Sequence, residues 1–264
     1  YLGASIGWQR LNFTTDSKHT ELDDKDTMWR FKTMTYEEII QTTGNGVNLK
    51  MGAIYRVSPA VRVGASVQTP TKFWLTDVYS STLSVTYHDG AKVDSFLRGQ
   101  TFMVGDTGTF KYNIVTPMKA TASVALLASK FLAVNMDIEY VNYKSGHLSS
   151  TPMYFTEVNK EIQKKYTATS NIRIGVESNI KPVIIRAGFA TYGSQFGNML
   201  TGKFVRNSYS AGVGFHNNDK FYVDLAVVIT KYTEDYYLYN PLFIHSTKLD
   251  FKTTTMIATI GKKF

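Results

Sequence analysis

Residues 221–232 read FYVDLAVVITKY, and this stretch decides the class of fold. Large apolar side chains occupy every second position: Phe221, Val223, Leu225, Val227 and Ile229. The positions between them are polar, aromatic or small, with Val228 as the one exception. A period of two indicates a β-strand that has an apolar environment on one face and a polar environment on the other.

The same alternation recurs along the whole chain. We predict nine further strands, over residues 1–13, 47–57, 61–69, 112–127, 132–140, 171–177, 183–190, 208–216 and 254–264. Several of them have the roughly 9–11 residues that a tilted membrane strand needs. Aromatic residues gather near the strand ends, as in an interfacial girdle. About ten strands of this kind favour an antiparallel up-and-down barrel.

The connections between these strands are of two kinds that alternate along the chain. Tight turns are predicted at residues 58–60, 129–130, 181–182 and 217–220. Long polar segments are predicted at residues 14–46, 70–111, 145–165, 193–205 and 233–252. Outer-membrane barrels have short turns on one rim and long loops on the other, whereas a soluble sandwich has no reason to do so. We therefore predict an all-β transmembrane β-barrel that forms one domain, residues 1–264.

Composition excludes several other classes. The mean hydropathy is −0.17, and no run approaches the roughly 18 apolar residues of a membrane helix. Cysteine is absent, which excludes disulfides and thiolate metal sites. The net charge of +8 comes from scattered Lys and Arg rather than from a basic stripe, which argues against nucleic-acid binding. The five His residues lie in no nucleophile motif, and the acidic residues 23–26 indicate a solvated loop. We expect no enzyme, no metal and no cofactor.

Three stretches carry a resemblance to a known family: VNLKMGAIYR at residues 47–56, TPMKATA at 116–122 and DIEYVNY at 137–143. In their order and spacing they resemble the FadL-type family of Gram-negative outer membranes, which transports fatty acids and other hydrophobic compounds. That family implies fourteen strands and an N-terminal hatch. Since about ten strands and no hatch are recognisable, the resemblance implies the C-terminal part of such a barrel.

The end of the chain resembles the C-terminal signal of outer-membrane barrels, because Phe264 is aromatic and follows Ile260 and Ala258 on one face. Lys262 departs from that signal, in which a hydrophobic residue is usual. The resemblance implies outer-membrane lipid and the outer-membrane assembly machinery as partners, the latter through Phe264.

If the apolar faces meet lipid, the charged side chains of the opposite faces line the lumen. These candidate pathway residues are Lys50, Lys119, Asp137, Glu139, Arg173, Glu177, Arg186 and Asp224. Charges of both signs in one enclosed space need partners or water, so one interpretation is a structural network that holds the strands in register. The other interpretation is that a cation such as Lys119 or Arg186 attracts the carboxylate of a fatty acid.

Two apolar clusters fall in the predicted long loops. They contain Phe73, Trp74, Leu75, Val78 and Tyr79 in one loop and Met153, Tyr154 and Phe155 in another. Apolar patches on loops often mark binding sites, so these residues are candidates for the first capture of a hydrophobic ligand. Aromatic anchors in the outer leaflet are an equally good interpretation. Residues 36–43 are predicted as a short helix or a bent strand.

The sequence therefore predicts an outer-membrane transporter for long-chain fatty acids or other hydrophobic compounds. Two alternatives stay open: a non-specific porin, and a structural or adhesive barrel without transport. Binding of a hydrophobic ligand and conductance across a bilayer separate the three.

Overall fold

The computed structural model describes residues 1–25, 27, 31–87, 101–103, 107–151, 154–197, 204–217, 221–237 and 245–262. Its elements are β1 (Leu2–Leu22), β2 (Phe31–Arg56), β3 (Val61–Gln68), β4 (Lys72–Tyr87), β5 (Thr101–Met103), β6 (Gly108–Val115), β7 (Lys119–Leu127), β8 (Leu132–Asn142), the 3₁₀ turn η2 (Tyr143–Ser145), β9 (His147–Ser149), α1 (Thr156–Lys165), β10 (Ala168–Ile180), β11 (Val183–Tyr192), β12 (Arg206–Asn217), β13 (Phe221–Tyr236) and β14 (Thr247–Lys262). Among the described residues no helix is long and apolar enough to cross a membrane.

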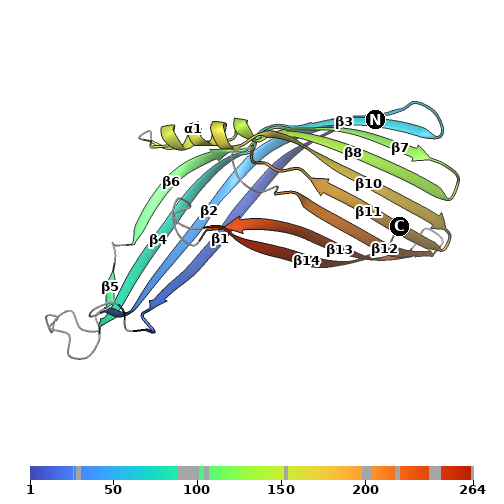
Figure 1. Cartoon of the computed structure of the whole chain (residues 1–264). Helices are drawn as coiled ribbons and strands as arrows, with labels where there is room; N and C mark the ends of the chain where they lie inside the picture. The colour runs from blue at the N-terminus through green and yellow to red at the C-terminus, as the bar shows by residue number, and fades with distance from the viewer. Residues whose placement is uncertain are drawn as a thin grey trace.

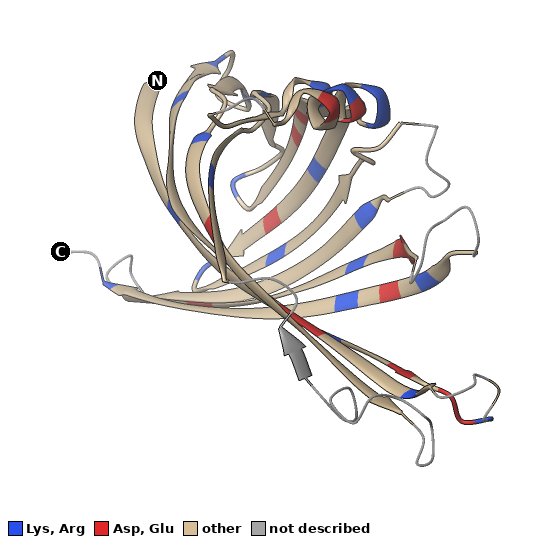
Figure 2. Ribbon diagram, turned by 90° about the vertical axis from the view of Figure 1, so that its left-hand side faces the viewer, with Lys and Arg blue, Asp and Glu red and all other residues tan. Residues whose placement is uncertain are grey.

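All the strands belong to one antiparallel sheet of 14 strands, which curves into the open trough seen in Figures 1 and 2. Three strand positions are each divided in two. Along one edge of β2, Lys50 pairs with Gln68 of β3 and Val47 pairs with Lys72 of β4. β3 and β4 therefore occupy one strand position. In the same way, β6 and β7, which pair with β4 and β3, occupy the next position, and β9 and β8, which pair with β6 and β7, occupy the one after it.

Proline explains two of the divisions. Pro70 separates β3 from β4, and Pro117 separates β6 from β7. Proline has no backbone N–H to donate to the ladder, so pairing is interrupted where it stands. Thr71 and Thr116 bridge the gap: the Thr71 N–H donates to the Thr116 hydroxyl at 2.9 Å, and the Thr116 N–H donates to the Thr71 carbonyl at 2.9 Å.

Counting each divided strand once gives an up-and-down order of β1, β2, β3–β4, β6–β7, β8–β9 and β10 to β14. The small strand β5 adds to β4 outside this order. The prediction of about ten antiparallel strands is confirmed. In the described residues β1 pairs only with β2 and β14 only with β13, so the sheet is not closed.

The tight turns are confirmed at residues 58–60, 129–130 and 181–182, where β2–β3, β7–β8 and β10–β11 meet. They lie at the right-hand end of the sheet in Figure 1, opposite α1. The turn at 217–220 lies mostly outside the described residues, although Asn217 and Phe221 pair across it. One rim therefore has short turns, as predicted.

Two of the long segments, residues 14–46 and 70–111, are mostly strand where the structure describes them, so the prediction of loops there was wrong, whereas residues 145–165 contain β9 and α1 and the described part of 193–205 contains no strand. β1 and β2 stay paired as far as Leu22 and Thr33, and β4 extends to Tyr87. Residues 36–43 belong to β2. These stretches are rich in threonine and β-branched residues, and cross-strand pairs such as Lys18 with Glu37 at 2.6 Å support them. β2 reaches 26 residues, more than twice the roughly 9–11 of a membrane strand.

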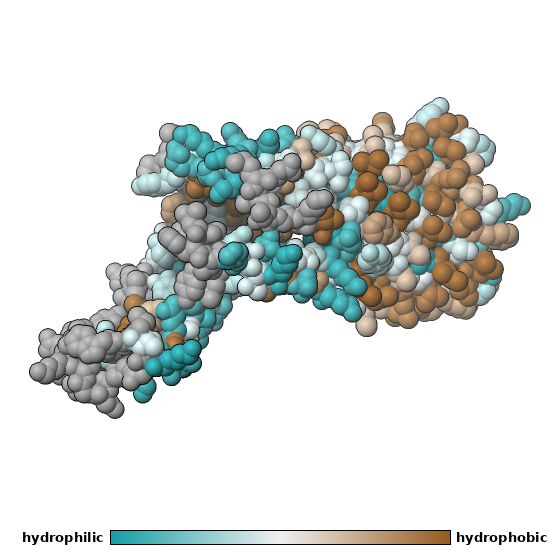
Figure 3. Space-filling model, viewed as in Figure 1, coloured by the Kyte–Doolittle hydropathy of each residue, from teal (hydrophilic) through white to brown (hydrophobic). Residues whose placement is uncertain are grey.

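The two faces of the sheet differ as the period of two predicts. Large apolar side chains on one face are widely exposed, including Leu225 at 53% and Met256 at 83%. Hydrophobic side chains gather over the part of the sheet with the short turns, and hydrophilic ones gather toward α1 and the far ends of β1, β2 and β4 (Figure 3). An apolar outer face above a rim of short turns is the surface that a membrane-embedded barrel wall presents to lipid.

Candidate functional site

Charged side chains of β10, β11 and β13 project from the concave face and form ion pairs with one another. Arg186 lies directly opposite Glu177 in the register of β10 and β11, and its Nε donates to Glu177 Oε2 at 2.8 Å. Its Nη1 donates to Asp224 Oδ1 on β13 at 2.6 Å. His216 Nε2 lies 3.3 Å from the same carboxylate oxygen. Four strands thus contribute to one charge network, which we call the Arg186 network.

Glycine makes this network possible. To reach Asp224 from β11, the Arg186 side chain must cross β12, which has Gly212 and Gly214 on the face between them. A Cβ at Gly214 would collide with the Asp224 carboxylate. The absence of a side chain at this position lets the guanidinium and the carboxylate meet over the strand.

A second group of charges lies nearer the opposite rim. Asn171 Nδ2 donates to Glu139 Oε1 at 2.8 Å, and Arg173 Nη2 lies 3.1 Å from the same oxygen. The guanidinium groups of Arg173 and Arg206 lie 5.7 Å and 4.4 Å from the ring centroid of Tyr192. Glu139 is therefore held by a cation and an amide at once.

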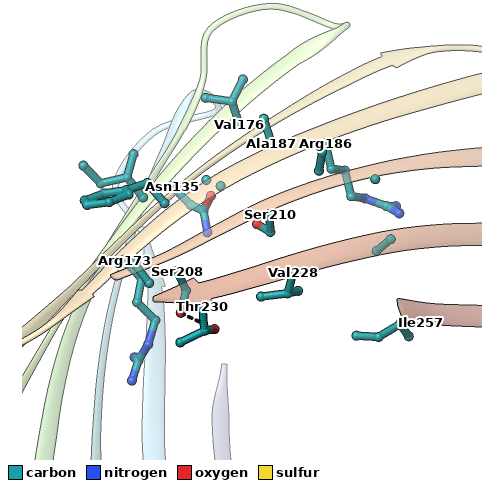
Figure 4. Close-up of a pocket in the computed structure, with 18 of the residues that line it drawn as sticks. Asn135, Arg173, Val176, Arg186, Ala187, Ser208, Ser210, Val228, Thr230 and Ile257 are labelled. Atoms are coloured by element: carbon teal, nitrogen blue, oxygen red, sulfur yellow. Dashed lines mark hydrogen bonds between the residues drawn. The ribbon is translucent and has the colours of Figure 1, made fainter. Parts of the chain in front are cut away.

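Between these two groups the concave face forms a hollow of about 870 Å³. Its floor consists of small residues, including Gly188, Ser210, Gly212 and Ala226. Figure 4 shows Arg173 and Arg186 projecting from the same face of the sheet, with Ser208 and Thr230, which are joined by a hydrogen bond of 2.8 Å, near Arg173 in this view. The lining combines small and apolar residues with many polar ones, six of which are charged: Asp137, Arg173, Glu177, Arg186, Arg206 and Asp224. The volume falls in the range of small-molecule sites.

Lys50 and Lys119 form a separate group on β2 and β7. A single row of paired residues runs Ser5, Lys50, Gln68, Lys119 across β1, β2, β3 and β7. It borders a hollow of about 520 Å³. In the part of the chain that the structure describes, neither lysine has a carboxylate within the 4.0 Å of an ion pair.

The structure therefore divides the predicted pathway residues. It brings Glu177, Arg186 and Asp224 together in one network and Glu139 with Arg173 in another. Lys50 and Lys119 lie in the third group, and Asp137 faces the larger hollow opposite Arg173 in the register of β8 and β10.

Sequence reasoning did not select several residues that the site contains. These are Gln68, Asn171, Tyr192, Arg206 and His216. The alternation itself could have found them, since each lies on the polar face of its strand. The predicted pathway residues were all Asp, Glu, Lys or Arg, so amide and aromatic side chains were left out. Arg206 was left out because it follows a segment predicted as a loop.

The candidate capture residues of the first cluster lie in strand β4 rather than in a loop, which corrects that placement. Leu75 is 4% exposed, so it is not an exposed apolar side chain, whereas Trp74 and Tyr79 are 49% and 45% exposed. Phe73 points to the opposite face of the sheet from Trp74, and its ring lies over Gly46 on the neighbouring strand β2. The strand forms because β4 pairs with β2 along its full length. Their role in capture stays a prediction.

The second cluster is divided. Tyr154 is 68% exposed, while the Phe155 ring packs 5.9 Å and 6.0 Å from the rings of Phe110 and Tyr112. Met153 and the C-terminal Phe264 lie outside the described residues. Within those residues no group of three or more His, Cys, Asp or Glu side chains is placed to hold a metal ion.

The geometry defines a class. An antiparallel up-and-down sheet with an apolar convex face, a polar and hollowed concave face, and one rim of tight turns is the wall of a transmembrane β-barrel.

No protein-family model matches the sequence, and no curated protein does. Among solved structures the chain is similar to the crystal structure of the Ralstonia pickettii toluene transporter TbuX, with a TM-score of 0.52 and 17% sequence identity. The match covers 99% of this chain and 63% of the TbuX chain. At this identity the likeness shows the fold, and this chain spans less than two thirds of the length of TbuX.

Proposed function

We propose that this chain is part of a FadL-type outer-membrane barrel that passes hydrophobic compounds, long-chain fatty acids among them, along its concave face. The observation that carries the proposal is the hollow of about 870 Å³ with its floor of glycine, alanine and serine. Its size falls in the range of sites for small hydrophobic ligands. The likeness of the fold to a toluene transporter supports it.

The arrangement of charges also supports a pathway for apolar compounds. Arg173 is engaged by Glu139 on β8, and Arg186 is engaged by Glu177 on β10 and by Asp224 on β13, so the charges of these two arginines are compensated. Paired charges bind less water than free charges do, so a hydrophobic solute displaces less bound water beside them. The alternative is a non-specific porin, which a wide ring of opposed acidic and basic lumen residues would favour and which bilayer conductance distinguishes.

In this proposal the protein acts by binding and passage rather than by catalysis, in a bacterial outer membrane. Its partners are the surrounding lipid, the hydrophobic solute and, through Phe264, the outer-membrane assembly machinery. The exposed side chains of Trp74, Tyr79 and Tyr154 are proposed to capture the solute first.

The test measures binding of 1-dodecanol and of dodecanoate to the full-length protein in detergent, by calorimetry. Ser210→Trp fills the hollow and is expected to weaken binding of both ligands at least tenfold. Ala211→Trp, the next residue on β12, projects from the convex face and is the matched control.

Conductance of the same protein in a planar bilayer completes the test. The proposal predicts little conductance of small ions together with saturable binding. Large ohmic conductance without binding would support a porin, and neither property would support a structural barrel.

A further inference from the structure

The convex face of β12, β13 and β14 has a polar hollow of about 360 Å³. Asn207, Lys231 and Lys252 border it, and they lie in a single row of paired residues across the three strands. On β13, Lys231 follows Val227 and Ile229 at every second position, so its side chain points to the same convex face. The row lies beyond the apolar part of that face, on the side away from the short turn between β12 and β13.

The charge of this hollow is positive. Lys231 and Lys252 lie directly opposite one another in the register of β13 and β14, where like charges weaken strand pairing. In the described part of the chain neither lysine has a carboxylate within the 4.0 Å of an ion pair. Asp250 also borders the hollow, and the Thr233 hydroxyl donates to its Oδ1 at 2.6 Å. Two ammonium groups against one carboxylate leave one positive charge, so the hollow favours an anion.

A second hollow, of about 700 Å³, lies on the same convex face. Its lining is almost entirely apolar and includes Leu225, Val227 and Met256. Val227 and Met256 form a pair that lies four residues along the strands from the pair of Lys231 and Lys252. At about 3.4 Å per residue this separation is roughly 14 Å. An amphiphile with its head group between the lysines would therefore lay its chains over the apolar hollow.

The chemistry of the two hollows fits a phosphorylated lipid. Lysine ammonium groups bind phosphate as point charges, and the amide of Asn207 can donate to a further phosphate oxygen. The polar row lies where apolar surface ends, at the depth of lipid head groups, and basic pockets at that depth bind anionic head groups. A dissolved anion would gain nothing from the apolar hollow beside it.

We propose that Asn207, Lys231 and Lys252 form a site on the outer wall of the barrel for the phosphorylated head group of a membrane lipid. The acyl chains of that lipid lie over the apolar hollow of β11 to β14. The site is on the opposite face of the sheet from the hollow of about 870 Å³. It goes beyond the proposed function, because it depends on the barrel wall and not on passage of a solute.

The experiment compares three probes on the full-length protein in detergent: dioleoyl phosphatidic acid, dioleoylglycerol, which has the same chains without the phosphate, and inorganic phosphate. Native mass spectrometry measures binding of the two lipids, and calorimetry measures binding of inorganic phosphate. Lys231→Met and Lys252→Met are each expected to weaken binding of phosphatidic acid about tenfold, the loss of one charge-assisted hydrogen bond. Binding of dioleoylglycerol is expected to be unchanged.

Lys248→Met is the matched control. Lys248 lies on the same face of β14 but outside the polar hollow, and Asp235 is opposite it in register. Its removal is expected to leave binding of phosphatidic acid unchanged, whereas a general attraction of anionic lipid to surface lysines would make the three variants equal. Circular dichroism checks the folding of each variant, and binding of 1-dodecanol, expected to be the same in all of them, checks the concave face.

Loss of phosphatidic acid that is restricted to Lys231→Met and Lys252→Met supports the site. Equal loss of both lipids, equal loss in Lys248→Met, or no loss would overturn it. Weaker binding of inorganic phosphate with unchanged binding of phosphatidic acid would show a site for a dissolved anion and would overturn the assignment to a lipid. Failure of the unaltered protein to bind 1-dodecanol would count against the proposed function and leave the lipid site standing.

Discussion

The concave face contains two regions with cationic side chains, and the regions differ in whether those cations form ion pairs. On β10 to β13, Arg186 is bound by Glu177 at 2.8 Å and by Asp224 at 2.6 Å. On β2 and β7, Lys50 and Lys119 have no ion-pair partner among the described residues. Both regions face the same side of one continuous sheet.

The difference teaches that charge on a lumenal face has two separate uses. A cation held by two carboxylates connects strands and is poorly available to a ligand. A cation without a partner contributes little to strand association and stays available. The ion pairs of Arg186 fit the first interpretation left open by the sequence, a structural network. Attraction of a ligand by the lysines stays a prediction.

The largest expected effect is on stability in the Arg186 network. Arg186→Ala leaves Glu177 and Asp224 close together without a cation, so the free energy of unfolding should fall by about 2–3 kcal/mol. Urea unfolding of the full-length protein in lipid vesicles measures this. The triple variant Glu177→Gln, Arg186→Met, Asp224→Asn should recover part of the loss, because no charge is then left unpaired. If the single variant is as stable as the unaltered protein, the network is not structural.

A smaller loss is expected at the crossing of β12. Gly214→Ala forces the Asp224 carboxylate away from Arg186 and should cost about 1–2 kcal/mol in the same unfolding measurement. Gly64→Ala is the matched control on β3 in the lysine region, where the atom nearest to an added Cβ lies at 3.5 Å, an ordinary van der Waals distance, so the substitution should cost almost nothing. Equal effects at the two glycines would contradict the comparison.

His216 is expected to have a weaker effect. Its Nε2 lies 3.3 Å from Asp224 and its ring lies 5.3 Å from that of Tyr222. His216→Phe keeps the ring contact and removes the polar one, so unfolding in urea should show a loss of about 0.5–1 kcal/mol. The same substitution made together with Asp224→Asn should add nothing further, and an undiminished additional loss would show that His216 acts through something other than Asp224.

The smallest effect on stability is expected in the lysine region. Lys50→Met and Lys119→Met should each change the free energy of unfolding by no more than about 0.5 kcal/mol, because no ion pair is broken. Urea unfolding beside Arg186→Ala makes the comparison direct. A loss as large as that of Arg186→Ala would show that the lysines are structural and that the two regions do not differ.

Much of the fold was predictable because the alternation of apolar and polar residues can be recognised within each short segment of sequence. The strands between the short turns, their order and the short-turn rim follow from the alternation and from residues such as Pro59 and Pro182. The extensions of β1, β2 and β4 were missed, since polar threonine-rich sequence is typical of loops as well as of exposed strands. Only pairing with a neighbour distinguishes the two, as for Thr20 and Thr35 in the extended hairpin.

The sequence by itself determined the strand segments beside the short turns, the two faces and which charges lie on the lumenal face, because a strand points alternate side chains to opposite sides wherever it lies. Only the tertiary structure decided which of those charges meet. The register places Glu177 opposite Arg186, and two glycines on β12 let Arg186 reach Asp224 two strands away. Lys50 and Lys119 have no carboxylate opposite them, because the same register places Ser5, Gln68 and Val141 there. Register depends on how neighbouring strands align along their whole length, and that is a property of the sheet rather than of any one segment.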